Sequence, residues 1–258
     1  MVRIINVCSG KGGVGKTTIT ANLGVAMQNI GKRVAVVDFN ITTSHLGLYF
    51  DMHMSPVTLN DFLRNQAKLE EAVYTHPSGL KIVPASLKLS DIVDVNTSAL
   101  RETLRSVFCN CDIVLLDSAP GLGREAMIAF QSCDEVLFVA NPFVPSMADI
   151  EKCKQVIYSL ESKPAVLGVI ANRVRNRSYE LTLEEMSQFL EMPVVGVVPE
   201  DENVLASFNT KSLVVMTNKK TPASKAFLKI ASNMAGVQYK EGFWERFRHI
   251  FRKEKDLG

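Results

Sequence analysis

Residues 9–18 have the composition and spacing of a phosphate-binding loop (P-loop). They read Ser-Gly-Lys-Gly-Gly-Val-Gly-Lys-Thr-Thr and satisfy the pattern G-x-x-x-x-G-K-[ST]. The glycines let successive backbone N–H groups turn toward one anion, and the helix that follows adds its positive dipole end. We expect Lys16 to reach the β- and γ-phosphates and the Thr17 hydroxyl to hold Mg²⁺. The loop therefore predicts a nucleoside triphosphate site.

Two aspartates each end an apolar run and are candidates for metal chemistry. Asp117 follows Ile113–Leu116, the arrangement of a Walker B strand, so we expect its carboxylate to accept hydrogen bonds from Mg²⁺-bound water. Asp38 follows Val34–Val37 and is a candidate for the Mg²⁺ ligand shell or for positioning the attacking water. The alternative for Asp38 is a turn or a helix N-cap. Both positions fall where a parallel sheet gathers its functional loops.

A second lysine, Lys11, follows the first glycine of the loop. On a generic P-loop it would be a solvated surface side chain. The string Gly10–Thr17, however, resembles the deviant Walker A motif of the MinD/ParA family of ATPases. In that family the matching lysine crosses a dimer interface to the partner's nucleotide, so that two ATP molecules lie between two subunits. The resemblance covers nearly the whole chain, is strongest for the MinD branch, and implies ATP, Mg²⁺ and a homodimer formed on ATP binding.

The two switch segments of that family have counterparts here. The loop after Val34–Val37 resembles the D-x-D of switch I, with Asp38 at the first position and Asn40 where the family's second aspartate orients water. The Asn40 amide accepts a hydrogen bond from water but takes no proton and carries no charge. Phosphoryl transfer depends mainly on positioning and electrostatics, so we expect slow ATP hydrolysis. Residues 118–123 resemble switch II, where the Gly121 N–H senses the γ-phosphate.

Two later segments resemble the family's adenine-binding elements. Asn172 and Arg173 match a strand-end asparagine that hydrogen-bonds adenine, and residues 198–201 match a loop that packs against the base. The alternatives are a turn asparagine and an N-cap aspartate, Asp201, at the start of a helix over Glu202–Phe208. The sequence contains no N-K-x-D string, so ATP is favoured over GTP.

Together these interpretations assign three sets of residues. The nucleotide-binding candidates are Gly10, Lys11, Gly12, Gly13, Val14, Gly15, Lys16, Thr17, Thr18, Gly121, Asn172, Arg173, Pro199, Glu200 and Asp201. The catalytic candidates are Lys11, Lys16, Asp38, Asn40 and Asp117. The Mg²⁺ candidates are Thr17, Asp117 through water, and Asp38.

Short apolar runs alternate with helical patterns along the chain, which indicates a buried parallel sheet with helices on both faces. We expect an α/β P-loop NTPase fold with a mostly parallel, twisted sheet of about eight strands. The expected strands are Ile4–Cys8, Val34–Val37, Leu80–Val83, Ile113–Leu116, Val136–Ala140, Val166–Ile170, Val194–Val198 and a weak Leu213–Val215. The expected helices are Thr17–Ile30, Leu59–Arg64, Leu100–Val107, Arg124–Ser132, Met147–Ser159, Thr182–Leu190, Glu202–Phe208 and Ala223–Met234.

Length and composition fit one ATPase domain, residues 1–236, followed by a linker and tail over 237–258. A hydrophobic content of 47% is ordinary for a globular core, and the net charge of +2 is too small to attract nucleic acid in bulk. The first expected strand begins at residue 4, which leaves no room for a signal peptide. No apolar run is long enough to span a membrane. We therefore expect a cytoplasmic location.

The 5 cysteines contain no C-x₂-C pair. Relatives that hold iron–sulfur clusters use P-loops of this kind, so a metal role is one interpretation. The alternative, which we favour, is a set of buried or partly buried thiols in a reducing compartment.

The tail over residues 242–253 has the pattern of an amphipathic helix. Its apolar face would carry Phe243, Trp244, Phe247, Ile250 and Phe251. Its opposite face would carry Arg246, Arg248, His249, Arg252 and Lys253. Bulky aromatics opposite a basic face are typical of a helix that lies in the surface of an anionic membrane. The alternatives are a helix packed on the core and a helix that binds a partner protein.

One such tail should bind membranes weakly, whereas two on one dimer gain about 10²–10⁴-fold from effective concentration. MinD proteins resemble this design, and ParA relatives lack the tail and bind DNA. We therefore expect a MinD-like ATPase, peripheral on the cytoplasmic membrane face, that positions the division site or another structure with an activator or cargo protein, and no nucleic-acid partner. The alternatives are a ParA-like DNA-partitioning ATPase, with basic residues at 173–177 and 219–220, and a nucleotide-held scaffold that Asn40 has nearly stopped from turning over.

Overall fold

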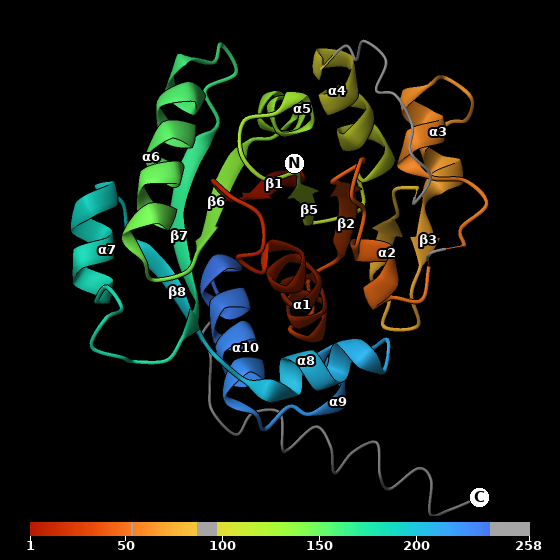
Figure 1. Ribbon diagram of the computed structural model, residues 1–258. Coiled ribbons are helices and arrows are strands. Elements are labelled where there is room, and N and C mark those ends of the chain that lie inside the picture. The colour runs from red at the N-terminus through yellow and green to blue at the C-terminus, as the bar shows by residue number, and fades with distance from the viewer. Residues whose placement is uncertain (53, 87–96, 238–258) are drawn as a thin grey trace, which may run out of the picture.

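Strands form one 8-stranded sheet in the order β3-β4-β2-β5-β1-β6-β7-β8 (Figure 1). The computed structural model describes residues 1–52, 54–86 and 97–237. All neighbouring strands described pair in parallel except β3 and β4, which pair antiparallel. The strands are β1 (Arg3–Cys8), β2 (Val34–Phe39), β3 (Tyr74–Thr75), β4 (Lys81–Val83), β5 (Ile113–Ser118), β6 (Glu135–Ala140), β7 (Ala165–Val174) and β8 (Val194–Pro199). The expected α/β fold is confirmed.

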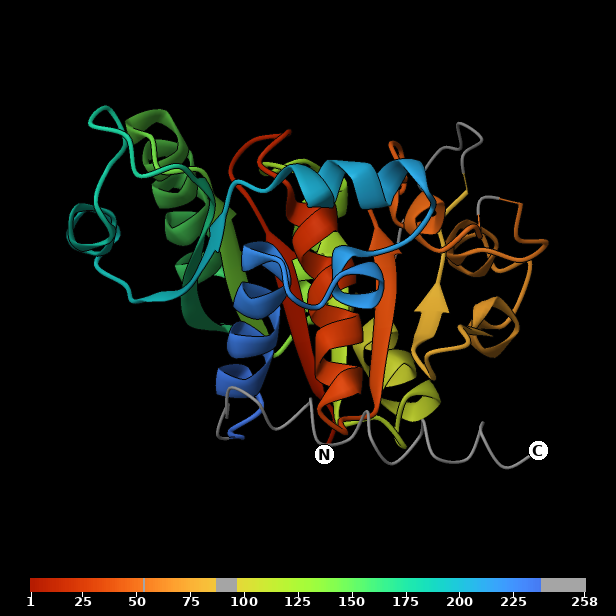
Figure 2. The ribbon, with the colours of Figure 1, turned by 90° about the horizontal axis from the view of Figure 1, so that it is seen from below.

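Helices cover both faces of the sheet (Figures 1 and 2). One layer contains α1, α9 and α10, with α8 beside them, and the other contains α4, α5 and α6. The helices are α1 (Lys16–Asn29), α2 (Leu46–Tyr49), α3 (Leu59–Leu63), the 3₁₀ helix η1 (Leu69–Ala72), α4 (Thr97–Val107), α5 (Arg124–Ser132), α6 (Val144–Ser159), α7 (Leu183–Leu190), α8 (Glu202–Asn209), α9 (Val214–Thr217) and α10 (Pro222–Met234). No helix among the described residues is both long and apolar enough to cross a membrane.

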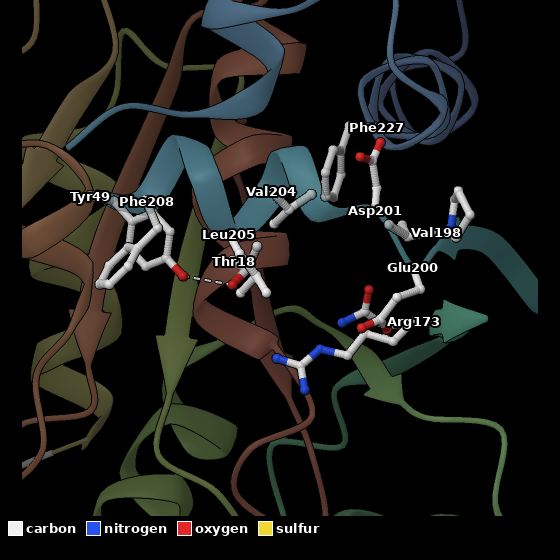
Figure 3. A pocket seen from close by; sticks show the side chains of 12 residues that line it. Thr18, Tyr49, Arg173, Val198, Glu200, Asp201, Val204, Leu205, Phe208 and Phe227 are labelled. Carbon is white, nitrogen blue, oxygen red and sulfur yellow. Dashed lines mark hydrogen bonds between the residues drawn. The ribbon is translucent and has the colours of Figure 1, made fainter. Parts of the chain in front are cut away.

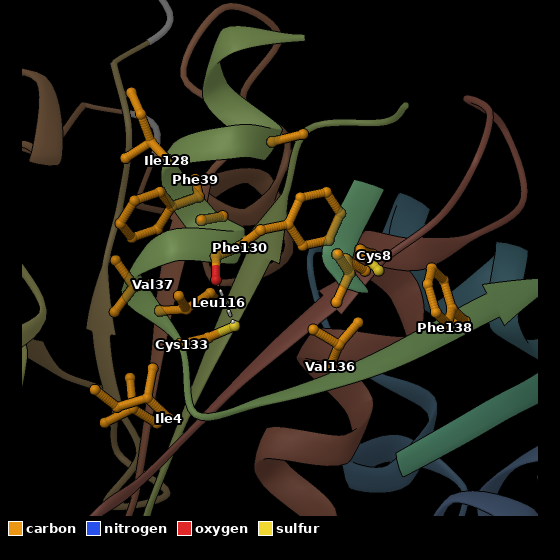
Figure 4. Close-up of a cluster of buried hydrophobic side chains, with 14 of the residues drawn as sticks. Ile4, Cys8, Val37, Phe39, Leu116, Ile128, Phe130, Cys133, Val136 and Phe138 are labelled. Carbon is orange, nitrogen blue, oxygen red and sulfur yellow. Dashed lines mark hydrogen bonds between the residues drawn. The ribbon is translucent and has the colours of Figure 1, made fainter. Parts of the chain in front are cut away.

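Each central strand buries side chains on both faces. Along β1, Ile4 and Cys8 belong to one hydrophobic cluster, and Ile5 and Val7 belong to the other. Figure 4 shows part of the first cluster, where Phe130 of α5 lies over the sheet. Because both faces are covered, the strands read as continuous apolar runs, which is why they were visible in the sequence.

The prediction of a weak strand over Leu213–Val215 is wrong, because the short helix α9 begins at Val214. Both valines are buried against the layer of α1 and α10, and the Val215 N–H points to Asn22 Oδ1 at 3.4 Å. A short apolar run is compatible with either a buried strand or a buried helical turn, and the packing decides. The edge strand β3, α2 and η1 were not predicted, and each has at most 4 residues.

Two helices begin three residues earlier than predicted. α6 starts at Val144 rather than Met147, with Pro145 in its first turn, where the missing N–H costs nothing. α4 starts at Thr97 rather than Leu100. Gly31 takes a left-handed conformation after α1, with φ of 86°. The tail residues 242–253, including the five apolar positions from Phe243 to Phe251, lie outside the described residues.

The cysteines are all free thiols. Cys8, Cys111, Cys133 and Cys153 are buried as expected, but Cys109 is exposed. Among the described residues, no cluster of three or more His, Cys, Asp and Glu side chains is placed to hold a metal ion.

Candidate functional site

The P-loop joins the end of β1 to the start of α1 and is packed between two neighbours. Gly13 and Gly15 have left-handed φ angles of 79° and 91°, which favour glycine. A Cβ on Gly15 would lie 2.4 Å from Nδ2 of Asn172, on β7. A Cβ on Gly10 would lie 2.4 Å from Cβ of Asp149, on α6. Glycine is therefore required at both positions because the loop has no space on either side.

The start of α1 brings Lys16 and the Walker B aspartate together. Lys16 is buried, and its Nζ lies 3.8 Å from Oδ1 of Asp117. Thr20 donates to the same oxygen at 3.3 Å. The other oxygen, Oδ2, is buried with no hydrogen-bond partner among the described residues. A buried carboxylate oxygen without a partner is costly, and a hydrated cation would satisfy it, so Asp117 fits a Mg²⁺ site; Thr17 lines the cavity at the same loop.

Asp38 lies beside Asp117, because the two residues are register partners on β2 and β5. Burial, and after it the charge of Asp117, raise the pKa of Asp38 from 3.8 to about 7. Burial also raises the pKa of Asp117, against the opposing effect of Lys16. The two carboxylates are therefore buried side by side with one lysine, which lies beside Asp117, and both would be stabilised in their ionised forms by a divalent cation.

Both oxygens of Asp38 are engaged by the loop that follows it. Oδ1 accepts from the Asn40 N–H at 3.0 Å, and Oδ2 accepts from Ser44 Oγ at 2.6 Å and the Leu46 N–H at 3.2 Å. These bonds match the alternative interpretation of Asp38 as a turn-forming aspartate. A direct role for Asp38 with Mg²⁺ or water stays a prediction.

The side chain of Asn40 is also held by its own loop. Its Nδ2 donates to the Thr43 carbonyl at 2.7 Å, and its Oδ1 accepts from Thr43 Oγ1 at 2.9 Å. Asn40 and Thr43 line the cavity that surrounds the P-loop, together with the exposed Lys11. We call this cavity, about 320 Å³ in volume, the phosphate pocket.

Gly121 lies where switch II was predicted, with a left-handed φ of 74°. Its N–H donates to the carbonyl of Ser9 at 2.9 Å, so it is directed at the P-loop backbone. A γ-phosphate can engage this N–H only if that bond opens. The sensing role of Gly121 therefore stays a prediction.

A second cavity of about 410 Å³ adjoins the phosphate pocket (Figure 3). We call it the base pocket because the expected adenine residues Asn172, Arg173, Pro199, Glu200 and Asp201 all line it. Val204, Leu205 and Phe208 of α8 and Phe227 of α10 supply its apolar wall. A mostly apolar cavity with a few polar groups suits a planar base.

The polar residues of the base pocket also hold the site together. Asn172 Nδ2 donates to the Val14 carbonyl at 2.7 Å, and Arg173 Nη1 donates to the Gly13 carbonyl at 3.2 Å. The amide expected to bind adenine therefore anchors the P-loop in this structure. Arg175, in the basic run that favoured the DNA alternative, is paired with Glu200 at 3.2 Å.

Asp201 is the N-cap of α8, which confirms the N-cap alternative. Its Oδ1 accepts from the Asn203 N–H at 3.0 Å, and its Oδ2 accepts from the Ala223 N–H at 3.1 Å. The side chain thus joins α8 to the first turn of α10. Asp201 also lines the base pocket, so one residue both caps α8 and contributes to the pocket wall.

Among the pocket-lining residues that the sequence analysis missed are His45, Tyr49 and Phe208. His45 lines the phosphate pocket, and Tyr49 and Phe208 line both cavities. His45 and Tyr49 belong to the unpredicted segment around α2, and Phe208 lies in the last turn of α8, whose inward face the sequence pattern did not reveal. No local motif marks any of them.

The chain matches the model of the CobQ/CobB/MinD/ParA nucleotide binding domain over residues 5–214. An uncharacterized ATP-binding protein of Methanocaldococcus jannaschii is 37% identical over 96% of both chains. The structure of the cell division ATPase MinD of Pyrococcus furiosus is 31% identical and aligns with a TM-score of 0.85 over 92% of this chain and 99% of that one.

Two further solved structures carry information on ligands and partners. The septum site-determining protein MinD of Pyrococcus horikoshii, complexed with Mg-ADP, is 31% identical with a TM-score of 0.84 over 93% of this chain and 100% of that one. The MinD of a MinC:MinD cell division complex from Aquifex aeolicus is 28% identical with a TM-score of 0.80, covering 93% of this chain and 98% of that one.

Proposed function

The chain belongs to the CobQ/CobB/MinD/ParA family as a MinD-like member, and from that premise we propose that it is an ATPase that binds ATP with Mg²⁺ and forms a nucleotide-dependent homodimer. The observation that carries the proposal is the unpartnered, buried Oδ2 of Asp117 beside Lys16. Mg-ADP in the Pyrococcus horikoshii relative supports the choice of ligand.

Several residues in and beside the phosphate pocket have distinct tasks in this proposal. The P-loop N–H groups and Lys16 bind phosphate oxygens, and Asp117 with Thr17 holds the hydrated metal. Mg²⁺, when bound, neutralises charge on the phosphates. Asn40 orients the attacking water through its amide oxygen, which must first exchange its bond with Thr43. Because Asn40 takes no proton, hydrolysis is slow.

Lys11 provides the test of the homodimer. Its side chain is exposed at the edge of the phosphate pocket, so it is accessible to a second subunit. Light scattering with Mg²⁺ and a non-hydrolysable ATP analogue should show dimers of the unaltered protein, and monomers with ADP. Lys11→Ala should stay monomeric while still binding ADP, and the exposed Lys229→Ala on α10 should dimerise normally. A wild-type protein that remains monomeric with the analogue would refute the dimer.

The same proposal extends to the membrane and to cell organisation. The aromatic and basic faces of residues 242–253 support attachment of the dimer to anionic lipid at the cytoplasmic membrane surface. The MinC:MinD complex supports a protein partner, and MinD relatives support a role in placing the division site. Liposomes should sediment the protein with ATP but not with ADP, and truncation after residue 241 should abolish this. Sedimentation that ignores both nucleotide and truncation would contradict the membrane switch.

A further inference from the structure

Four residues lie on the boundary between the two cavities. Thr18, Tyr49, Arg173 and Phe208 line both the phosphate pocket and the base pocket. In a nucleotide the sugar joins the base to the phosphates, so a ligand that fills both cavities must place its sugar at this boundary. The residues that line both cavities are therefore those nearest the sugar.

Tyr49 is fixed at this boundary by two contacts (Figure 3). Its ring lies against that of Phe208, with centroids 4.8 Å apart and planes tilted by 54°. Its hydroxyl lies 2.6 Å from Thr18 Oγ1, and either oxygen can be the donor. Burial raises the pKa of the Tyr49 phenol, so the hydroxyl stays neutral and can both donate and accept. One hydrogen-bonding capacity remains after Thr18 is satisfied.

The segment that carries Tyr49 is held at both ends. α2 begins at Leu46, and the Leu46 N–H donates a hydrogen bond to Asp38, so the first turn of the helix is bonded to the switch I aspartate. Beyond the helix, Asp51 pairs with Lys211 at 2.7 Å, which fastens the segment to the turn after α8. The position of the Tyr49 hydroxyl is therefore set by the fold rather than by a free rotation of the loop.

We propose that Tyr49 is the residue that positions the ribose of the bound nucleotide, by a hydrogen bond from its hydroxyl to a sugar hydroxyl, with Phe208 holding its ring in place. The proposal rests on the proposed nucleotide-binding function. It makes Tyr49 a physical link between the sugar and the loop that carries Asp38 and Asn40.

Calorimetric titration with Mg·ADP, Mg·2′-deoxy-ADP and Mg·3′-deoxy-ADP tests this assignment. The wild-type protein should bind ADP about 5–10-fold more tightly than at least one deoxy analogue, the value of one neutral hydrogen bond. Tyr49→Phe should lower the affinity for ADP by that factor, leave the affinity for that analogue unchanged, and so lose the discrimination. Phe208→Ala should weaken all three ligands and reduce the discrimination.

Tyr74→Phe is the matched control. The Tyr74 hydroxyl also makes close hydrogen bonds, donating to the Val57 carbonyl at 2.9 Å and accepting from its N–H at 3.1 Å, but it lines neither cavity. This variant should keep all three affinities. Equal binding of the three ligands by the wild type, or equal weakening of all three by Tyr49→Phe, would overturn the ribose assignment. Failure of the wild type to bind any of them would instead refute the nucleotide-binding function itself.

Discussion

Asp38 and Asp117 are register partners on the adjacent parallel strands β2 and β5. Both are fully buried at the carboxyl ends of these strands, where the P-loop lies. Their difference is in their partners: both oxygens of Asp38 accept loop hydrogen bonds, whereas Asp117 has one oxygen unused. Without a bound cation, the pair favours a proton on Asp38, because Asp117 has Lys16 beside it.

The stability of the free protein should therefore depend on the pH through Asp38. Its pKa rises from 3.8 to about 7 on folding. Between these two pKa values the folded state keeps a proton that the unfolded chain releases. The free energy of unfolding therefore falls as the pH rises from 3.8 to about 7, by at most about 4 kcal/mol. Urea unfolding followed by circular dichroism, in EDTA between about pH 5 and 8, should show this fall in the wild type and a flatter profile in Asp38→Asn.

Asp112→Asn is the control for that measurement. Arg33 holds the pKa of the Asp112 carboxyl at about 2, so Asp112 stays ionised across the same range. This variant should retain the wild-type slope. Identical slopes for the wild type and Asp38→Asn would show that Asp38 does not hold the proton.

Gly15→Ala should weaken the fold and the nucleotide site together. The new methyl group would meet Asn172 Nδ2 at 2.4 Å, in a left-handed backbone that alanine disfavours. We expect the free energy of unfolding to fall by at least about 1–2 kcal/mol and Mg·ADP affinity to fall at least tenfold. At Gly12 a Cβ meets only Pro120, at 3.9 Å, so Gly12→Ala should unfold at nearly the wild-type urea concentration. Equal destabilisation by both substitutions would contradict this account of the loop.

Asn40→Asp should speed ATP hydrolysis and destabilise the nucleotide-free protein. A carboxylate supplies a proton-accepting group beside the attacking water, so we expect the rate of ATP hydrolysis to rise on the order of 10–100-fold. It also loses the donor to the Thr43 carbonyl and adds charge near Asp38, at a cost of about 1–3 kcal/mol. Steady-state phosphate release and urea unfolding measure the two effects.

Thr43→Ala is the control that separates the effect of the new charge from the effect of a lost loop hydrogen bond on the rate of ATP hydrolysis. It removes the hydroxyl that donates to Asn40 Oδ1 without adding a carboxylate. Its rate should stay within a few-fold of wild type. If Asn40→Asp hydrolyses ATP no faster than the wild type, the asparagine is not what slows the reaction.

Asp201→Ala should affect both stability and nucleotide binding. It removes the cap of α8 and the acceptor for the Ala223 N–H, a loss of about 1–2 kcal/mol. Thr182→Ala removes a comparable cap from α7, which lines neither cavity. Thermal unfolding should show a similar loss for both variants, and calorimetry should show weaker ADP binding for Asp201→Ala alone. Unchanged ADP binding in Asp201→Ala would remove Asp201 from the site.

The parts of the site that the sequence predicted are those encoded by contiguous residues. The P-loop, Asp38 and Asp117 each follow an apolar strand, and a parallel sheet necessarily collects such strand ends at one edge. That constraint placed Asn172 and Asp201 nearby as well, although both also have structural tasks that no motif announces.

The parts that the sequence did not predict depend on packing between distant segments. Tyr49 of α2 and Phe208 of α8 are far apart in the sequence and meet at the boundary between the two pockets. Neither helix has a repeating pattern long enough to show its inward face. The Leu213–Val215 segment failed for a related reason, since three apolar residues fit a buried strand and a buried turn equally well.

The missing space beside Gly10 has a mechanical meaning. Because Asp149 already occupies the place of a methyl group there, the ligand-gripping backbone and the beginning of α6 have no slack between them. Val144, in the first turn of α6, is open to solvent on the outside of the molecule. A displacement of α6 toward the P-loop would therefore be transmitted to the backbone at Gly10 by direct contact.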